Sequence, residues 1–423
     1  MERVLPGEPV ASLDDYLDLG GGTGLVVARG MEPAAIIEEV RRSGLRGRGG
    51  AGFPTGLKWR GAATDTPPRA VVCNAAEGEP GTFKDRAILS RNPFSVLEGI
   101  AIAAKAVQAE TAYVGIKSLF SEQIDRLQSA AGEMSDAGLL GEVDLRMILG
   151  PDDYLFGVET AMLEVIEGRD PLPRLVPPYI QGLTAPEGSP VAVAVNNVET
   201  LANVPGVLAH GSTWFRSVGT EKSPGTMVFT VTGDVVNPTV IELALGTPLS
   251  FLIYGAAGGL PNRRRAKLVV SGVSNVPLSN SELDSPLSFE GMEAVGSGLG
   301  SAGFMVYDET TCPVEVAAVL SEFLQMGSCG QCPPCKLGTT EFAIGFRRIM
   351  TGESSLEEIE ELTAWLARVT DANRCGLGAG QRALAGGILT KFAGDVIACL
   401  EGRCSGHRGL GLPLSPSLDT LIG

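Results

Sequence analysis

Two different spacings of apolar residues follow one another along the N-terminal half of the chain. Short apolar runs typical of buried strands occur at residues 70–74, 111–116 and 144–149. Around them, apolar positions recur at helical spacing over residues 35–43, 94–107, 119–130 and 154–167. Strands that alternate with helices predict a parallel α/β layer in this half of the chain.

The pattern changes after residue 168. Residues 168–190 are rich in Pro and Gly, which is typical of surface chain. From residue 226 to about 308, short apolar runs such as 227–231 and 267–270, with one helix near 248–254, predict a small α+β domain. Beyond this, helical spacing predicts a bundle, with helices at residues 314–325, 337–350, 355–369 and 381–400. We therefore expect three domains, at residues 1–224, 225–312 and 313–423.

The composition narrows the class of protein. The chain has 423 residues, 44% of them hydrophobic, and a formal net charge of −16. So acidic a chain lacks the basic surface that nucleic-acid binding needs. It contains no apolar run of about eighteen residues, and its start has no signal-peptide pattern. We therefore predict a cytoplasmic protein with no direct membrane span, for which association with a membrane through the partners of a complex stays open.

The strongest chemical signal is a compact run of cysteines. Cys329, Cys332 and Cys335 are each separated by two residues, and Cys375 follows about forty residues later. Three closely spaced thiolates and a fourth are typical of a [4Fe–4S] cluster. Zinc binding and metal-free packing are the alternatives, although zinc sites more often combine two separated Cys-x2-Cys pairs. The proline pair after Cys332 is expected to keep the ligand turn out of a helix.

The other cysteines and the two histidines carry no such signal. Free cysteine is often buried, so we interpret the four cysteines that match no cluster spacing as structural: Cys73, Cys312, Cys399 and Cys404. His210 and His407 lie in no motif and are interpreted as ordinary residues.

A glycine-rich segment and the polar run that follows it suggest a nucleotide site. Residues 44–57 contain six glycines, with Arg46 and Arg48 among them and Lys58 directly after. Glycine lets backbone amides approach an anion, and basic side chains complement its charge, so a nucleotide phosphate is the expected ligand. A tight turn is the alternative, since the spacing matches neither the dinucleotide fingerprint nor the Walker loop.

Asn74 ends the predicted strand at 70–74 and Glu77 follows it, at the strand end where α/β folds place ligands. Their side chains can hydrogen-bond sugar hydroxyls or the edge of a ring. Solvated loop charges are the alternative interpretation.

Four motifs, in this order, resemble one known family. They are residues 47–53 with Lys58 and Trp59, residues 77–86, residues 196–200, and residues 328–335 with Cys375. Together they resemble the NADH-oxidising flavoprotein subunit (the F-type subunit) of respiratory complex I and the related diaphorase subunits of NAD-linked hydrogenases and formate dehydrogenases. The resemblance extends from about residue 34 to 404.

The resemblance implies an α/β N-terminal flavin and nucleotide domain, an α+β ubiquitin-like (SLBB) middle domain and an all-α C-terminal helical bundle with the iron–sulfur cluster. It implies the cofactors FMN, NAD(H) and one [4Fe–4S] cluster. The expected activity is that of an NADH dehydrogenase (NADH:acceptor oxidoreductase) subunit, which passes electrons from NADH through FMN singly to the cluster and on to a partner. The expected partners are a thioredoxin-like [2Fe–2S] subunit and a larger multi-cluster iron–sulfur subunit.

The resemblance also implies roles for individual residues. The residues expected to hold FMN are Gly47, Arg48, Gly49, Lys58, Asn74, Asn196, Asn197 and Thr200, with Glu77 as a further cofactor-binding residue. Those expected to face NADH are Phe53, Glu79, Phe83 and Glu159, with Tyr179 as a stacking ring where the family usually has Phe. Glu79 and Glu159 are the candidate catalytic residues. The expected cluster ligands are Cys329, Cys332, Cys335 and Cys375.

Two positions depart from the family pattern. Ala76 and Val158 stand where the family usually has Asp and Glu. Each missing hydrogen bond to a charged group is worth about 1–3 kcal/mol, so weaker NADH or FMN binding is expected, and less negative charge beside a flavin raises its potential. The alternative function is therefore an FMN and iron–sulfur relay or scaffold that has lost NADH oxidation. The residues that favour the dehydrogenase are Lys58, Glu79, Phe83 and Glu159.

Overall fold

The first sheet contains the strands that the apolar pattern predicts. The computed structural model describes residues 3–64, 68–369, 374–404, 406–414 and 421. Strands β1 (Arg69–Ala75), β2 (Thr111–Lys117), β3 (Asp144–Gly150) and β5 (Pro190–Asn197) run parallel, and the short β4 (Leu183–Thr184) pairs antiparallel at the edge, in the order β3-β2-β1-β5-β4. The predicted strands at 70–74, 111–116 and 144–149 are confirmed.

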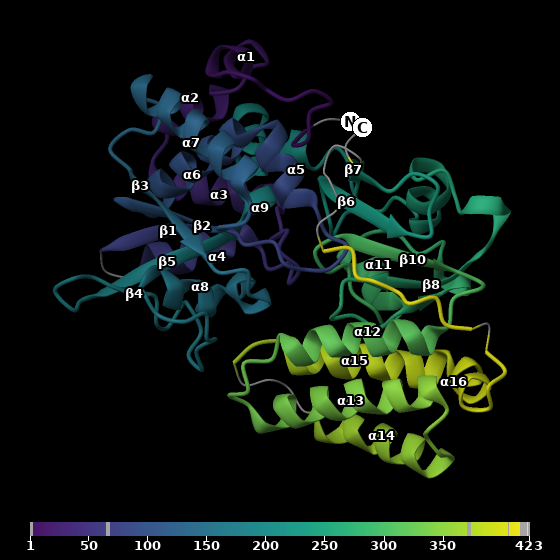
Figure 1. The fold of residues 1–423 in the computed structure, drawn as a ribbon. Helices are drawn as coiled ribbons and strands as arrows, with labels where there is room; N and C mark the ends of the chain where they lie inside the picture. Colours follow the sequence, from purple (N-terminus) through teal and green to yellow (C-terminus); the bar gives the residue numbers. More distant parts are fainter. Residues whose placement is uncertain (1–2, 65–67, 370–373, 405, 415–420, 422–423) are drawn as a thin grey trace.

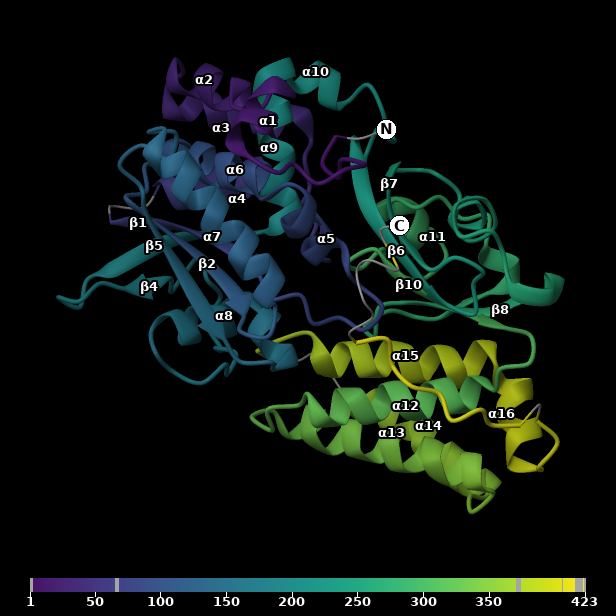
Figure 2. The same ribbon diagram turned by 45° about the horizontal axis from the view of Figure 1, so that its top comes forward.

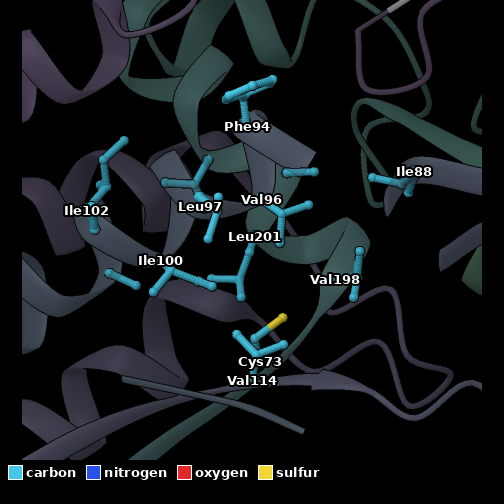
Figure 3. Packing of buried hydrophobic residues seen from close by; sticks show 14 of the residues in the cluster. Cys73, Ile88, Phe94, Val96, Leu97, Ile100, Ile102, Val114, Val198 and Leu201 are labelled. Carbon is cyan, nitrogen blue, oxygen red and sulfur yellow. The ribbon is translucent and has the colours of Figure 1, made fainter. Parts of the chain in front are cut away.

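Helix α6 (Pro93–Val107) is the centre of the N-terminal core. The Asn92 side chain accepts a hydrogen bond from the Ser95 amide at 3.2 Å, and Pro93 takes the first helical position, where its missing amide costs nothing. Its side chains pack between the sheet and helix α9 (Val198–His210), as Figure 3 shows for Leu97 of α6, Leu201 of α9 and Cys73 of β1. The predicted helix at 94–107 is confirmed.

Among the described residues ahead of the first strand there are four further helices: α1 (Leu13–Asp18), α2 (Thr23–Arg29), α3 (Pro33–Ser43) and α4 (Thr55–Thr64). The buried Glu98 carboxylate of α6 accepts hydrogen bonds from the Tyr16 hydroxyl at 2.6 Å, the Gly22 amide at 2.8 Å and the Leu25 amide at 2.7 Å. One buried side chain thus attaches α1 and α2 to the core. The spacing of apolar residues predicted only α3 of these four helices.

The remaining N-terminal helices complete the cover of the sheet: α5 (Lys84–Arg91), α7 (Ser121–Asp136), α8 (Glu159–Ile166) and α10 (Ser212–Phe215). The helix predicted at 154–167 is divided into a 3-10 helix at Tyr154–Gly157 and α8, because Val158 is extended (φ −76°, ψ 129°). The helix predicted at 119–130 corresponds to α7.

The middle part of the chain forms a second five-stranded sheet, in the order β7-β6-β10-β8-β9. Its strands are β6 (Thr226–Gly233), β7 (Thr239–Ala244), β8 (Ala266–Ser271), β9 (Leu278–Ser279) and β10 (Gly303–Asp308), of which β6 and β10 are parallel. Its helical segments are a π-helix at Phe251–Ala256, close to the helix predicted near 248–254, short 3-10 turns at Pro261–Arg263 and Asn280–Glu282, and α11 (Phe289–Ala294).

In the described part of the remaining chain, five helices form a layer beneath the two sheets in both views (Figures 1 and 2): α12 (Pro313–Met326), α13 (Pro333–Thr351), α14 (Leu356–Arg368), α15 (Leu377–Lys391) and α16 (Ala393–Leu400). Apolar residues of α12 share a cluster with Leu268 and Met305 of the middle sheet. The helix predicted at 381–400 is wrong as one helix, because α15 and α16 meet at Phe392 with a 79° bend.

The expectation that the proline pair keeps the cysteine turn non-helical is also wrong. Helix α13 begins at Pro333, so Cys335 lies in its first turn. Proline is well tolerated there, since the first amides of a helix have no partner inside the helix.

No single helix among the described residues is long and apolar enough to cross a membrane. The bent pair α15 and α16 meets the length and composition criteria only when the two are taken together.

The C-terminal segment 406–414 returns across the molecule (Figure 1, yellow). The Arg408 guanidinium pairs with Asp234 of the middle domain at 2.7 Å. Further on, the Pro413 carbonyl accepts a hydrogen bond from the Gly81 amide of the N-terminal domain at 3.1 Å. This strap therefore contacts both domains that precede the helices.

Candidate functional site

A cavity of about 660 Å³ lies at the carboxyl ends of β1 and β5. Its wall combines the glycine loop, the segment after β1, the start of α8 and residues 297–301 of the middle domain. The sequence-predicted residues that line it are Gly47, Gly49, Phe53, Lys58, Asn74, Glu77, Glu79, Glu159, Asn196, Asn197 and Thr200. The fold thus brings together residues that are more than 150 positions apart in the sequence.

The glycines of the glycine loop present backbone to this cavity. The Gly47 amide donates to the Phe53 carbonyl at 2.8 Å, which closes the loop. Gly52 has a φ of 63°, a left-handed conformation that favours glycine. A Cβ on Gly49 would lie 3.3 Å from the Asn197 Cβ, so the loop approaches the end of β5 closely.

Arg48 does not line the cavity. Its side chain is fully buried and donates to the Thr226 carbonyl at 2.9 Å, while its amide donates to Thr200 Oγ1 at 2.8 Å. Burial lowers its pKa to about 10. The structure therefore places the Arg48 side chain at the junction with β6, where it positions the glycine loop.

Lys58 and Glu159 form an ion pair on the cavity wall, and Lys58 also donates to the Val195 carbonyl at 2.9 Å. Asn74 and Asn196 are held by neighbouring groups. Asn74 Nδ2 donates to the Gly157 carbonyl at 2.7 Å, and Asn196 Oδ1 accepts from the Trp59 indole at 3.2 Å. These polar side chains are therefore pre-positioned by the protein itself.

Glu79 joins the N-terminal and middle domains. Its carboxylate accepts from the Val273 amide at 2.5 Å and from the Tyr154 hydroxyl at 2.9 Å. Burial raises the pKa of Glu79, although these two donors oppose the shift. A Cβ on Gly272 would lie 2.4 Å from Glu79 Oε1, so only glycine leaves room for this carboxylate.

Tyr154 was not among the predicted site residues. Its ring packs edge-on against Phe323 of α12, with 5.1 Å between the ring centres, and its pKa is raised by burial and by the charges of Glu79 and Cys375. Tyr154 therefore lies between the cavity and the cysteines. Its position four residues before Val158, where the chain departs from the family pattern, was the available signal.

A buried ionic network supports the cavity floor. The Lys84 ammonium lies 2.8 Å from Asp85 and 3.0 Å from Glu199, and it also donates to Asn197 Oδ1 at 3.0 Å. Burial alone would lower the pKa of Lys84, but the surrounding carboxylates raise it. The charged form is thus retained in the interior, as paired buried charges require.

Glu77 and Phe83 are buried beside this network. The Glu77 carboxylate accepts from Arg86 at 3.0 Å, and its pKa is raised by burial and by the Asp85 charge. Phe83 lies in the core under the Arg86 guanidinium and does not line the cavity. Tyr179 is 77% exposed and does not line it either.

The two positions that lack a carboxylate have different surroundings. Ala76 is 2% exposed and shares an apolar cluster with Phe156 and Met162. Val158 is half-buried on the cavity wall. Both residues line the cavity, so a carboxylate at either position would face a bound ligand, but one at Ala76 would also contact the apolar side chains packed alongside.

The four predicted cluster cysteines converge at the end of the helical layer. Cys329 and Cys332 lie between α12 and α13, Cys335 in the first turn of α13, and Cys375 ahead of α15. A Cβ on Gly378, three residues after Cys375, would lie 3.3 Å from the Cys335 Cβ, so the start of α15 packs against the start of α13. Burial raises the pKa of Cys375, and the charges of the nearby Cys335, Cys329 and Cys332 raise it further.

Both sites fit the groups that the sequence predicts. The cavity has a volume typical of a cofactor site, and its buried Thr55 Oγ1 has no hydrogen-bond partner within the described protein. Four convergent thiols are the donor set of a [4Fe–4S] cluster. The Gln331 side chain donates to Cys329 Sγ at 3.4 Å, and Ser328 Oγ lies 3.4 Å from Cys335 Sγ, so polar groups surround the sulfurs.

Family models match three regions of the chain. The Nuo51 FMN-binding domain matches residues 40–206, the SLBB domain residues 228–274, and the iron–sulfur binding region of NADH-ubiquinone oxidoreductase-F residues 315–399. The F 2 subunit of NADH-quinone oxidoreductase from Rhizobium meliloti is 40% identical over 93% of this chain and 96% of its own length. The chain belongs to the family of NADH-quinone oxidoreductase F subunits. The predicted family is confirmed.

Other members include the hydrogenase branch. The NADP-reducing hydrogenase subunit HndC of Solidesulfovibrio fructosivorans is 37% identical over 87% of this chain and 76% of its own length. The crystal structure of an NAD+-reducing [NiFe]-hydrogenase in the H2-reduced state matches with a TM-score of 0.82 and 33% identity, over 93% of this chain and 67% of that one. The predictions of an FMN-binding domain, an SLBB domain and a [4Fe–4S] region are confirmed. The relay or scaffold alternative is not favoured.

Proposed function

We propose that this chain takes hydride from NADH in the 660 Å³ cavity and delivers electrons singly to its [4Fe–4S] cluster and on to a partner subunit. FMN supplies the change from an electron pair to single electrons. The observation that carries the proposal is Tyr154, which contacts Glu79 of the cavity on one side and Phe323, next to the cysteine loop, on the other.

The polar cavity wall supports a division of roles. The glycine loop, Thr55 and Thr200 would hold the phosphate and ribityl groups of FMN, because backbone amides and hydroxyls suit those oxygens. Asn74, Asn196 and Asn197 would hold the flavin ring edge. Phe53, which is half exposed at the cavity, would meet the nicotinamide nucleotide.

The carboxylates Glu79 and Glu159 would orient NADH rather than exchange protons with it. Glu159 is held by Lys58 and Glu79 by Tyr154 and Val273, so both keep fixed positions on the wall. Fixed polar groups orient a nicotinamide for hydride transfer without reorganisation during the reaction.

The domain limits and partners are part of the same proposal. We place the boundaries at residues 1–224, 225–312 and 313–423, and we assign the middle sheet with its short helices to the ubiquitin-like class. Relatives are named as subunits of oxidoreductases and hydrogenases. We therefore propose a thioredoxin-like [2Fe–2S] subunit and a multi-cluster iron–sulfur subunit as partners, and a cytoplasmic location.

Anaerobic addition of NADH to the FMN-loaded full chain tests the activity. We expect the visible flavin absorbance to bleach, with dithionite as the positive control. Bleaching by dithionite but not by NADH would contradict the dehydrogenase proposal and leave the relay function in its place.

A further inference from the structure

Four side chains outside the iron–sulfur site converge at the far end of the helical layer. They are Cys312, Cys399, Cys404 and His407, and their donor atoms all lie within 4.8 Å of one another. Cys312 Sγ is 3.7 Å from Cys399 Sγ, and His407 Nε2 is 3.4 Å from Cys399 Sγ and 3.6 Å from Cys404 Sγ. In the described part of the chain, no other group of metal-ligating side chains is so compact.

These distances match a tetrahedral metal site. Zinc binds thiolate sulfur at about 2.3 Å and imidazole nitrogen at about 2.0 Å, so neighbouring ligands are about 3.8 Å apart for two sulfurs and about 3.5 Å for sulfur and nitrogen. A disulfide between Cys312 and Cys399 would need about 2.05 Å instead. Each cysteine of a [4Fe–4S] cluster binds a different iron, whereas four ligands as close together as these can share one ion. The compact group therefore fits a single-ion site.

We propose that Cys312, Cys399, Cys404 and His407 bind one structural zinc ion, distinct from the [4Fe–4S] cluster. Three thiolates and one imidazole form a closed donor set that structural zinc prefers and that leaves no position for a substrate. Cys312 and Cys399 are buried, which excludes water from the inner side of the site. Cys399, Cys404 and His407 lie within nine residues, and the distant Cys312 completes the set.

The zinc would fix the position of the start of the C-terminal strap, residues 406–414. Cys312 immediately precedes α12, Cys399 lies near the end of α16, and Cys404 and His407 belong to the segment that leaves the helical layer. Directly after His407, the amides of Arg408, Gly409 and Leu410 donate to the Glu315 carboxylate at 2.6–3.1 Å.

From there the strap continues to Asp234 of the middle domain and to Gly81, two residues from Glu79. One metal ion thus determines where the strap starts, and the strap ends beside the cavity. The role is structural, and it does not depend on whether NADH is the donor.

Metal analysis of the full chain, produced with both iron and zinc in the medium, tests the proposal. We expect about one zinc per chain in addition to the cluster iron. Cys404→Ala should lose most of the zinc and keep the iron, whereas Cys332→Ala should lose iron and keep the zinc. Cys73→Ala is the matched control, since it removes a buried thiol of the N-terminal core, which contains none of the ligands of either site, and should change neither metal.

A wild-type protein without zinc, or a Cys404→Ala variant with wild-type zinc content, would overturn the proposal. X-ray absorption at the zinc edge of the wild type keeps the test valid if the variant does not fold. Three sulfurs at about 2.3 Å and one nitrogen at about 2.0 Å are expected, and a shell of oxygen and nitrogen only would refute the ligand set. A Cys312–Cys399 disulfide in non-reducing peptide maps would refute it as well.

Discussion

Removing the Tyr154 hydroxyl should separate two contributions to the stability of the folded protein, that of the Glu79 charge and that of side-chain packing. Tyr154→Phe keeps the ring against Phe323 but removes the donor 2.9 Å from Glu79 Oε2. Glu79 then keeps only the Val273 amide among its two hydrogen-bond donors. A hydrogen bond to a buried charged group is worth about 1.5–3 kcal/mol.

The pH dependence of the stability follows from the direction in which the pKa of Glu79 is shifted. Burial raises it above the unfolded value of about 4.3, so the folded protein holds this proton more tightly than the unfolded chain does. The stabilisation from that proton is complete below the unfolded pKa and is lost as the pH rises through the folded pKa. Because Tyr154 opposes the shift, Tyr154→Phe raises the pKa of Glu79 further. The variant should therefore lose more stability than the wild type at higher pH.

Melting temperatures of wild type and Tyr154→Phe across a range of pH values provide the assay. We expect a small difference at acidic pH, where Glu79 is protonated in both proteins. At neutral pH the variant should melt about 3–10 °C lower, from the free energy of the lost hydrogen bond and the usual conversion for domains of this size.

Tyr307→Phe is the matched control. Tyr307 is also a buried tyrosine, but its hydroxyl contacts the Met305 sulfur at 3.9 Å rather than a carboxylate. Its effect should be small and nearly independent of pH. A Tyr154→Phe deficit that stays constant or shrinks with rising pH would show that Glu79 is not charged in the folded protein, which would refute the reasoning.

Three further predictions address other parts of the molecule. Val158→Glu restores a carboxylate on the cavity wall and should tighten NADH binding to the FMN-loaded chain about tenfold, the worth of one charged hydrogen bond; calorimetric titration that finds weaker or equal binding would contradict this. Glu98→Ala leaves three buried hydrogen-bond donors without an acceptor and should lower the free energy of unfolding by more than about 3 kcal/mol in denaturant titration. Glu110→Ala, at an exposed position, is the control and should change the free energy of unfolding little. Cys332→Ser should abolish the cluster's electron paramagnetic resonance signal after reduction, and an unchanged signal would remove Cys332 from the ligand set.

Local signals in the chain predicted the parts of the fold that depend on near neighbours. The apolar run at 70–74 predicted β1 and the helical spacing at 94–107 predicted α6, because burial on both faces and amphipathic periodicity are properties of a few consecutive residues. The helix before the first strand at Thr55–Thr64 was missed, since it begins inside the glycine-rich segment that resembles a loop.

The two wrong predictions about the C-terminal helices share one cause. The proline pair after Cys332 starts a helix instead of preventing one, and Phe392 interrupts what the spacing predicts as one helix. In each case the local preference permits two outcomes, and packing against the neighbouring helices selects one.

What the sequence by itself determined is the chemistry of the two sites: the glycine loop, the asparagines at the carboxyl ends of β1 and β5, and the four cysteines predicted to bind the cluster. What only the tertiary structure decided is which distant residues meet. Arg48 points into the domain junction, Tyr154 reaches Glu79, and Cys312 approaches Cys399, 87 residues later. Such contacts depend on how the elements pack in three dimensions, and a spacing pattern describes only residues that are close along the chain.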